Sequence, residues 1–170
     1  MKSVEKVWLE EVPWESLVEI NKALCHAQQT EFTTNARGLN IAKQRWEAAV
    51  KKSMTLADVL AVCRECHDAG PFIFNNGNTF GSVAKTLIQN WLNNLPPLEA
   101  EIVRATVSHY VVGLVGKREL GDVLKHFEPV LKKAPAPKAA QPQAAAVPQP
   151  GDSTTTTTAP IQTAPASQAV

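Results

Sequence analysis

The sequence has few of the features that mark exported or membrane proteins. Its 170 residues include three cysteines, two methionines and one tyrosine. The opening residues, MKSVEKVWLEEVPW, contain no apolar signal core, and no run of about 18 apolar residues follows. We therefore expect neither export nor a membrane span, and no disulfide framework.

An excess of charge of one sign is also missing. The chain holds 17 Lys and Arg against 16 Asp and Glu, so its formal net charge at pH 7 is +1. Proteins that bind nucleic acids or membranes through net charge alone carry a clear basic excess. The balance argues against indiscriminate binding of that kind and leaves room for a site built from a few cations.

Aromatic residues are absent from the last part of the chain. From Ala134 onward the sequence is rich in Ala, Pro and Thr and holds seven of the twelve prolines. Such a segment has too little apolar surface to offset the entropy lost on ordering. We predict a disordered tail over residues 134–170 and a folded domain over residues 1–133.

The folded part shows helical periodicity in six segments and no convincing strand alternation. The first expected helix begins at Trp14, the second covers about 36–52, and the third lies between Thr55 and Gly70-Pro71. The fourth follows a loop at 72–78, the fifth covers about 98–115, and the sixth covers 118–127. Short connections between such helices favour an all-α fold, an antiparallel bundle of the four-helix type with additional short helices.

Several local signals fix these helices. Asn35 or Thr34 is the expected cap of the second helix, and Thr55 with Asp58 resembles a capping box for the third. The first helix is expected to bury the stripe Leu17, Ile20, Leu24 and Ala27. The fifth is apolar almost all round, which predicts a place at the centre of the bundle.

The sharpest short pattern is CRECH, residues 63–67. It matches the Cys-x-x-Cys-His sequence that attaches c-type haem. Cys63 and Cys66 also continue the apolar stripe of the third helix, where cysteine packs as a small hydrophobe. We favour buried structural cysteines over haem attachment and expect no cofactor.

Two other chemical interpretations are weaker. Cys25 and His26 could join the CRECH cysteines as zinc ligands, but adjacent helical residues point about 100° apart and rarely share one tetrahedral site. No motif typical of a catalytic site is present, and His109, in the most apolar helix, is expected in the core. We therefore expect neither a metal site nor an enzyme.

Three stretches, taken in order, resemble the coat proteins of rod-shaped plant RNA viruses of the tobamovirus and tobravirus type. VWLEEVPWESLVEI (7–20) is similar to the tobravirus start. Phe32, Thr34, Ala36 and Arg37 match the tobamovirus Phe-x-Thr-x-x-Ala-Arg motif with one residue fewer. LEAEIVRATVSHYVVGLVGKRELGDVLKHFE (98–128) resembles the last long helix, its internal arginine and the terminal Phe-Glu pair, and a flexible tail follows as in tobraviruses.

The resemblance implies a four-helix bundle that stacks into a helical rod around single-stranded RNA, in the virion and the host cytoplasm. It implies that Arg37 contacts RNA and that Arg104 corresponds to the arginine in the last long helix. Helix position alone adds Arg45 and Lys85 as weaker RNA-binding candidates. The partners expected are further copies of the chain and single-stranded RNA, with no membrane and no small-molecule substrate.

Two departures from the family pattern are visible. The resemblance places NNLPPLE (93–99) between the third and fourth bundle helices, where the family carries RNA-facing arginines, and this segment has no cation. The helix expected around CRECH replaces a strand-like stretch. Subunit contacts are expected from apolar bundle faces, with Trp8, Trp14 and Phe127 at the outer end. The alternative is a cellular helical adaptor that binds a protein partner.

Overall fold

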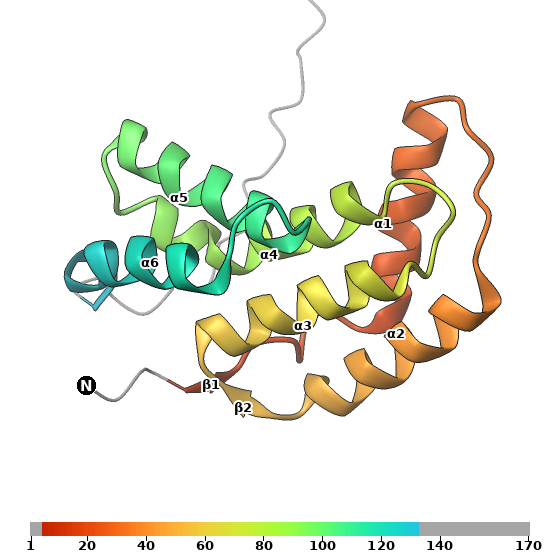
Figure 1. Ribbon diagram of the computed structural model, residues 1–170, viewed down its shortest axis with the longest axis horizontal. Helices are drawn as coiled ribbons and strands as arrows, with labels where there is room; N and C mark the ends of the chain where they lie inside the picture. Colours follow the sequence, from red (N-terminus) through yellow and green to blue (C-terminus); the bar gives the residue numbers. More distant parts are fainter. Residues whose placement is uncertain (1–4, 133–170) are drawn as a thin grey trace, which may run out of the picture. The chain divides into compact units, whose positions relative to one another are not determined.

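The computed structural model describes the backbone of residues 5–132 and the side chains of residues 5–127 (Figure 1). Six helices account for most of it: α1 (Trp14–Ala27), α2 (Ala36–Val50), α3 (Leu56–Ala69), α4 (Asn76–Leu92), α5 (Pro97–Val111) and α6 (Lys117–Lys132). Two-residue strands, β1 (Lys6–Val7) and β2 (Ser53–Met54), complete it. The expected all-α class is confirmed. The predicted tail, 134–170, lies outside the described residues.

The helices α2 to α5 pack in chain order, each against the next. In addition, α3 contacts α5, α1 packs on α4 and α2, and α6 packs on α5. Three helices, α3, α4 and α5, thus have three helical neighbours each and form the centre of the unit. The fifth helix is thus among the central ones, as expected, but it is not buried all round, since Leu98 and Ile102 on α5 are 74% and 45% exposed.

Local signals explain where the helices begin and end. The Asn35 side chain accepts a hydrogen bond from the Gly38 backbone, and Thr55 and Asp58 form the expected capping box. Gly70 ends α3 in the left-handed conformation with φ 63°, which glycine adopts without strain. The structure differs at α4, which begins at Asn76, inside the predicted loop 72–78.

The core is a single cluster of apolar side chains that includes a run of aromatic rings. Phe72 lies between Trp14 and Phe80, with ring centroids 6.3 Å and 6.5 Å away, and Phe80 continues to Trp46 at 6.3 Å. The Trp46 indole donates a hydrogen bond to the Val12 carbonyl at 2.9 Å. Burying one such ring contributes about 1.5–3 kcal/mol, so this run fixes α1, α2 and α4 against one another.

The strands hold the chain start against the beginning of α3. Lys6 pairs with Met54 and Val7 with Ser53 in antiparallel register. The Trp8 indole donates to the Met54 carbonyl at 2.8 Å, and its ring meets Trp91 edge-on at 5.0 Å. Trp8, Trp14 and Phe127 are at most 6% exposed, so these three side chains belong to the core. They offer little surface for the subunit contacts in which the sequence placed them.

Two further expectations about the core are corrected. Ala27 is exposed, and α1 instead buries Asn21 and Cys25. His109, expected in the core, is exposed on α5. The side of α5 that faces the core carries Val103, Val107 and Val111, so a histidine two residues beyond Val107 turns outward.

Candidate nucleic-acid interface

Arg37 is the second residue of α2, and its side chain is exposed. The first turn of α2 contains no acidic residue. Within the part of the chain that the structure describes, Arg37 has no ion-pair partner. A cation beside the positive end of the helix dipole is slightly unfavourable, and an anion bound from outside would relieve that cost.

The segment before Arg37 is held against the connection between α3 and α4. Thr34 forms an antiparallel bridge with Phe72, and backbone hydrogen bonds of 2.9 Å run from Asn35 to Pro71 and from Ile73 to Thr33. We call the paired segments 33–35 and 71–73, with the flanking Arg37 and Phe74, the loop edge. It joins parts of the sequence that lie almost forty residues apart.

Close packing of α2 on α3 fixes the direction in which α2 leaves the loop edge. A Cβ atom on Gly38 would lie 2.3 Å from the Ala69 carbonyl oxygen and 2.4 Å from that of Gly70. Only glycine permits such an approach of two backbones. The position of Arg37, one residue earlier, is therefore set by the packing of the two helices.

The loop edge exposes apolar side chains at the end away from Arg37. Ile73 is 53% exposed and Phe74 is 47% exposed, although their neighbour Phe72 is buried. Phe32 lies half-buried against Phe72, and the Lys22 ammonium lies 5.6 Å from the Phe32 ring centroid. The sequence pattern singled out neither Lys22 nor Phe74, because only the fold brings α1 and residues 71–75 to the segment before Arg37.

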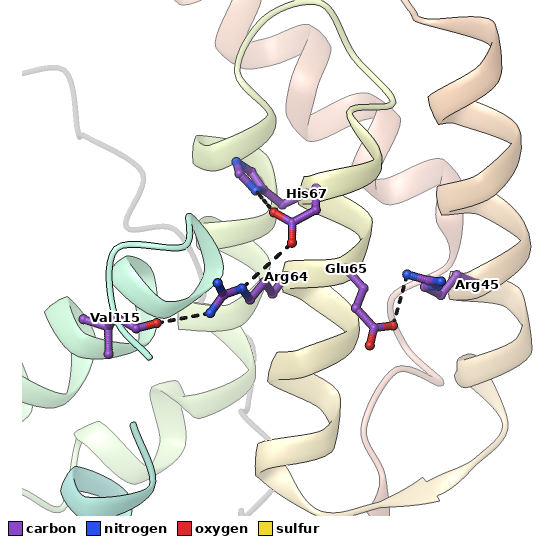
Figure 2. A network of polar contacts seen from close by, with 6 residues as sticks. Arg45, Arg64, Glu65, His67 and Val115 are labelled. Carbon is purple, nitrogen blue, oxygen red and sulfur yellow. Dashed lines mark hydrogen bonds and ion pairs between the residues drawn. The ribbon is translucent and has the colours of Figure 1, made fainter. Parts of the chain in front are cut away.

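The other predicted RNA-binding residues lie elsewhere. Arg45, on α2, pairs with Glu65 on α3 at 3.2 Å (Figure 2), and Arg104, on α5, pairs with Glu101 one turn earlier. Lys85 is half-buried on α4. The four cations thus lie on three helices, α2, α4 and α5, and two of them are engaged in ion pairs.

Arg64, which the sequence did not single out, is the most connected cation described. Its Nη1 donates to the Val115 carbonyl at 3.2 Å, its guanidinium lies 5.1 Å from the Tyr110 ring centroid, and its Nε is 3.9 Å from Asp68 (Figure 2). Burial raises the pKa of Tyr110, although Arg64 acts in the opposite direction. These contacts tie α3 to the connection between α5 and α6, which is a structural role.

The CRECH cysteines are buried, as expected. Cys63 and Cys66 are both 0% exposed. Burial raises the pKa of both thiols, to about 12 for Cys66, so they stay neutral and poorly nucleophilic at physiological pH. His67 is directed to Asp68, with 3.1 Å between Nδ1 and the carboxylate.

Over residues 5–127, no three His, Cys, Asp or Glu side chains gather in a way that could hold a metal ion. Among the described helices, none combines the length and the apolar character needed to cross a membrane.

The loop edge is therefore the place where the structure combines an exposed cation, an exposed aromatic ring and a rigid backbone. These are the groups that contact phosphates and unpaired bases in single-stranded nucleic acids. No protein-family description, no curated protein and no solved structure matches the chain.

Proposed function

We propose that this protein is a viral coat protein that assembles side by side into a helical rod and encloses single-stranded RNA. The proposal combines the resemblance of residues 7–20, 32–37 and 98–128 to rod-shaped virus coat proteins with two features of the surface. One is an apolar face that has no cover in the described part of the chain. The other is the loop edge with Arg37.

The observation that carries the proposal is that α5 has two apolar faces. Val103 and Val107 lie on the side that packs into the unit, whereas Leu98 and Ile102 lie on the opposite side and are 74% and 45% exposed. Exposing two large aliphatic side chains four residues apart costs free energy in an isolated monomer. We assign this exposed face of α5 to contact with the next subunit.

The assembly would be open-ended if the surface that meets this face is a different one. The apolar Ile41, 42% exposed, lies on α2, and α3 and α4 separate α2 from α5. Contacts between two different surfaces of identical subunits produce rings or helical filaments, whereas a self-complementary contact stops at a dimer. Side-by-side stacking of the α5 face on a surface that includes Ile41 would give a filament.

Near-neutral charge fits this role. Each subunit of a rod needs only a few cations near the RNA, because the contact is repeated along the strand. Arg37 is the cation that we assign to phosphate contact. Arg45 and Arg104, which are engaged in ion pairs, and Lys85 are weaker candidates, and the segment 93–99 supplies no cation.

The test is RNA protection. Purified protein is mixed with single-stranded RNA, sedimented and treated with nuclease, and protected RNA is expected with the wild type. Arg37→Ala should reduce protection while helix content stays constant. Arg118→Ala is the matched control, because Arg118 is likewise the exposed second residue of its helix, α6. Equal protection by both variants would remove the role assigned to Arg37.

A protein-binding adaptor is the second candidate, and the same exposed face of α5 favours it. An adaptor would bury Leu98 and Ile102 against a different protein and would have no need of RNA. Size-exclusion chromatography distinguishes the two functions. Monodisperse monomers whose size does not change with RNA, pH or ionic strength support the adaptor, and large assemblies support the coat protein.

A further inference from the structure

Phe74 combines two properties that seldom occur together. Its side chain is 47% exposed, although it is aromatic, and its backbone carbonyl accepts a hydrogen bond from a buried side chain. It sits between buried Phe72 and the start of α4 at Asn76. An exposed ring on a fixed backbone is suited to contact with a flat partner.

Buried polar groups hold this backbone. The Nδ2 of Asn21, 0% exposed, donates to the Phe74 carbonyl and to the Thr79 hydroxyl, both at 2.9 Å. Thr79 in turn donates to the Asn75 carbonyl at 2.8 Å. Asn75 itself has φ 63°, an uncommon conformation for a residue with a side chain.

The following residue closes the loop from the other side. Asn76 accepts a hydrogen bond from the Phe72 backbone at 3.0 Å and donates back to the Phe72 carbonyl. The backbone from Phe72 to Asn76 is therefore ordered before any partner binds. Binding to a preordered segment avoids the entropy cost of fixing a flexible loop.

The charges along the loop edge favour an anionic partner. Neither α2 nor α4, whose first turns flank the loop edge, has an acidic residue there, and α2 carries Arg37 instead. The nearby acids are Glu31, exposed in the connection to α2, and Asp68 at the end of α3. Asp68 is already paired with Arg64 and His67.

We infer that Phe74 is a stacking platform for an unpaired RNA base, at the opposite end of the loop edge from Arg37. This inference rests on the proposed function and adds the way in which the strand is held. Stacking tolerates any base, since every base presents a flat π face. A coat protein that binds RNA of any base sequence needs this kind of contact.

The test measures binding of a labelled six-nucleotide RNA, too short to drive rod assembly, by fluorescence anisotropy. Phe74→Leu keeps an apolar side chain of similar size but has no π face, and it should weaken binding by about five- to a hundredfold. Phe74→Trp should bind at least as tightly as the wild type. Leu114→Ala, at an exposed apolar position outside the loop edge, is the control and should bind as the wild type does.

The outcomes separate this inference from the proposed function. If the wild type binds RNA and Phe74→Leu binds equally well, stacking is refuted and the coat-protein proposal stands. If Phe74→Leu retains both binding and assembly while Phe74→Ala loses assembly, the side chain makes an apolar contact with a second copy, and the inference is again refuted. If the wild type neither binds RNA nor assembles, the proposed function itself fails.

Discussion

The buried amide of Asn21 donates a hydrogen bond to the backbone carbonyl of Phe74 at 2.9 Å, across fifty-three residues of sequence. The same nitrogen donates to the Thr79 hydroxyl, and the side-chain Oδ1 of Asn21 accepts a hydrogen bond from the Cys25 thiol at 3.6 Å. A single side chain on α1 thereby connects the middle of one helix to the loop edge and to the first turn of α4.

Removing this amide should destabilise the protein. Asn21→Ala leaves the partly buried Phe74 carbonyl without its side-chain donor, and an unsatisfied buried polar group costs about 1–3 kcal/mol. Urea unfolding followed by circular dichroism measures the loss. The control is Asn40→Ala, an exposed position on α2, where a change within about 0.5 kcal/mol is expected. Equal unfolding midpoints for the two variants would show that the network does not stabilise the fold.

The contact between α2 and α3 makes a second prediction. Gly38→Ala places a Cβ atom against two backbone carbonyls that cannot rotate away, and overpacking of this kind costs about 1–3 kcal/mol or more. Gly121→Ala is the matched control, because nothing lies within 4 Å of the Cβ there and alanine favours a helix over glycine by about 1 kcal/mol.

Thermal unfolding should therefore shift in opposite directions for these two glycines. The melting temperature is expected to fall for Gly38→Ala and to stay equal or rise for Gly121→Ala. An unchanged melting temperature for Gly38→Ala would mean that α2 and α3 do not approach each other as described.

The buried thiols predict how stability depends on alkaline pH. In the folded state burial raises the pKa of Cys66 to about 12, and burial beside Cys66 raises that of Cys63 as well. In the unfolded chain a thiol titrates near about 8.5. Between these values the unfolded state releases a proton that the folded state retains, so the free energy of unfolding falls by about 1.4 kcal/mol per pH unit for each thiol.

The measurement is urea unfolding at a series of pH values from 7 to 10. Stability should be level below about pH 8 and should decline above it. The double variant Cys63→Ala, Cys66→Ala lacks these protons and should show a flatter decline. Parallel curves for the two proteins would contradict the burial of the thiols.

Neighbouring residues on α5 test the two apolar faces. Ile102 is 45% exposed and Val103 is 3% exposed. Ile102→Glu should change the free energy of unfolding by no more than about 0.5 kcal/mol and should abolish assembly, because it places a charge in the subunit contact. Val103→Glu buries that charge in the core and should unfold the protein. Sedimentation velocity that shows assembly by Ile102→Glu would exclude this face as the contact.

Local signals in the sequence predicted much of the fold. Asn35, the pair Thr55 and Asp58, and Gly70 act within one turn of their own helix, so their roles follow from spacing alone. The pairing of β1 with β2 was not predicted from the sequence, because strands of two residues are too short to show an alternation of apolar and polar residues. This pairing also depends on the hydrogen bond between the distant residues Trp8 and Met54. The buried side of α1 was misjudged because Asn21 is polar and is satisfied only by residues of α4 and its preceding loop.

The candidate site was less predictable. Sequence reasoning named Arg37 from a motif, but it could not show that the motif packs against residues 71–73, since that pairing is set by tertiary structure. It also grouped Arg37 with Arg45, Arg104 and Lys85, which the fold distributes over three helices. A cation on a helix surface carries no local signal that tells an ion pair from a ligand contact, as the pair between Arg45 and Glu65 illustrates.

Negative-stain electron microscopy of the purified protein, with and without added single-stranded RNA, is the most direct test that this chain assembles along RNA. The account predicts rods in the presence of RNA, and discs or stacked rings under some conditions of pH and ionic strength without it. Micrographs that show only isolated small particles at high protein concentration, in every buffer and with RNA present, would contradict it.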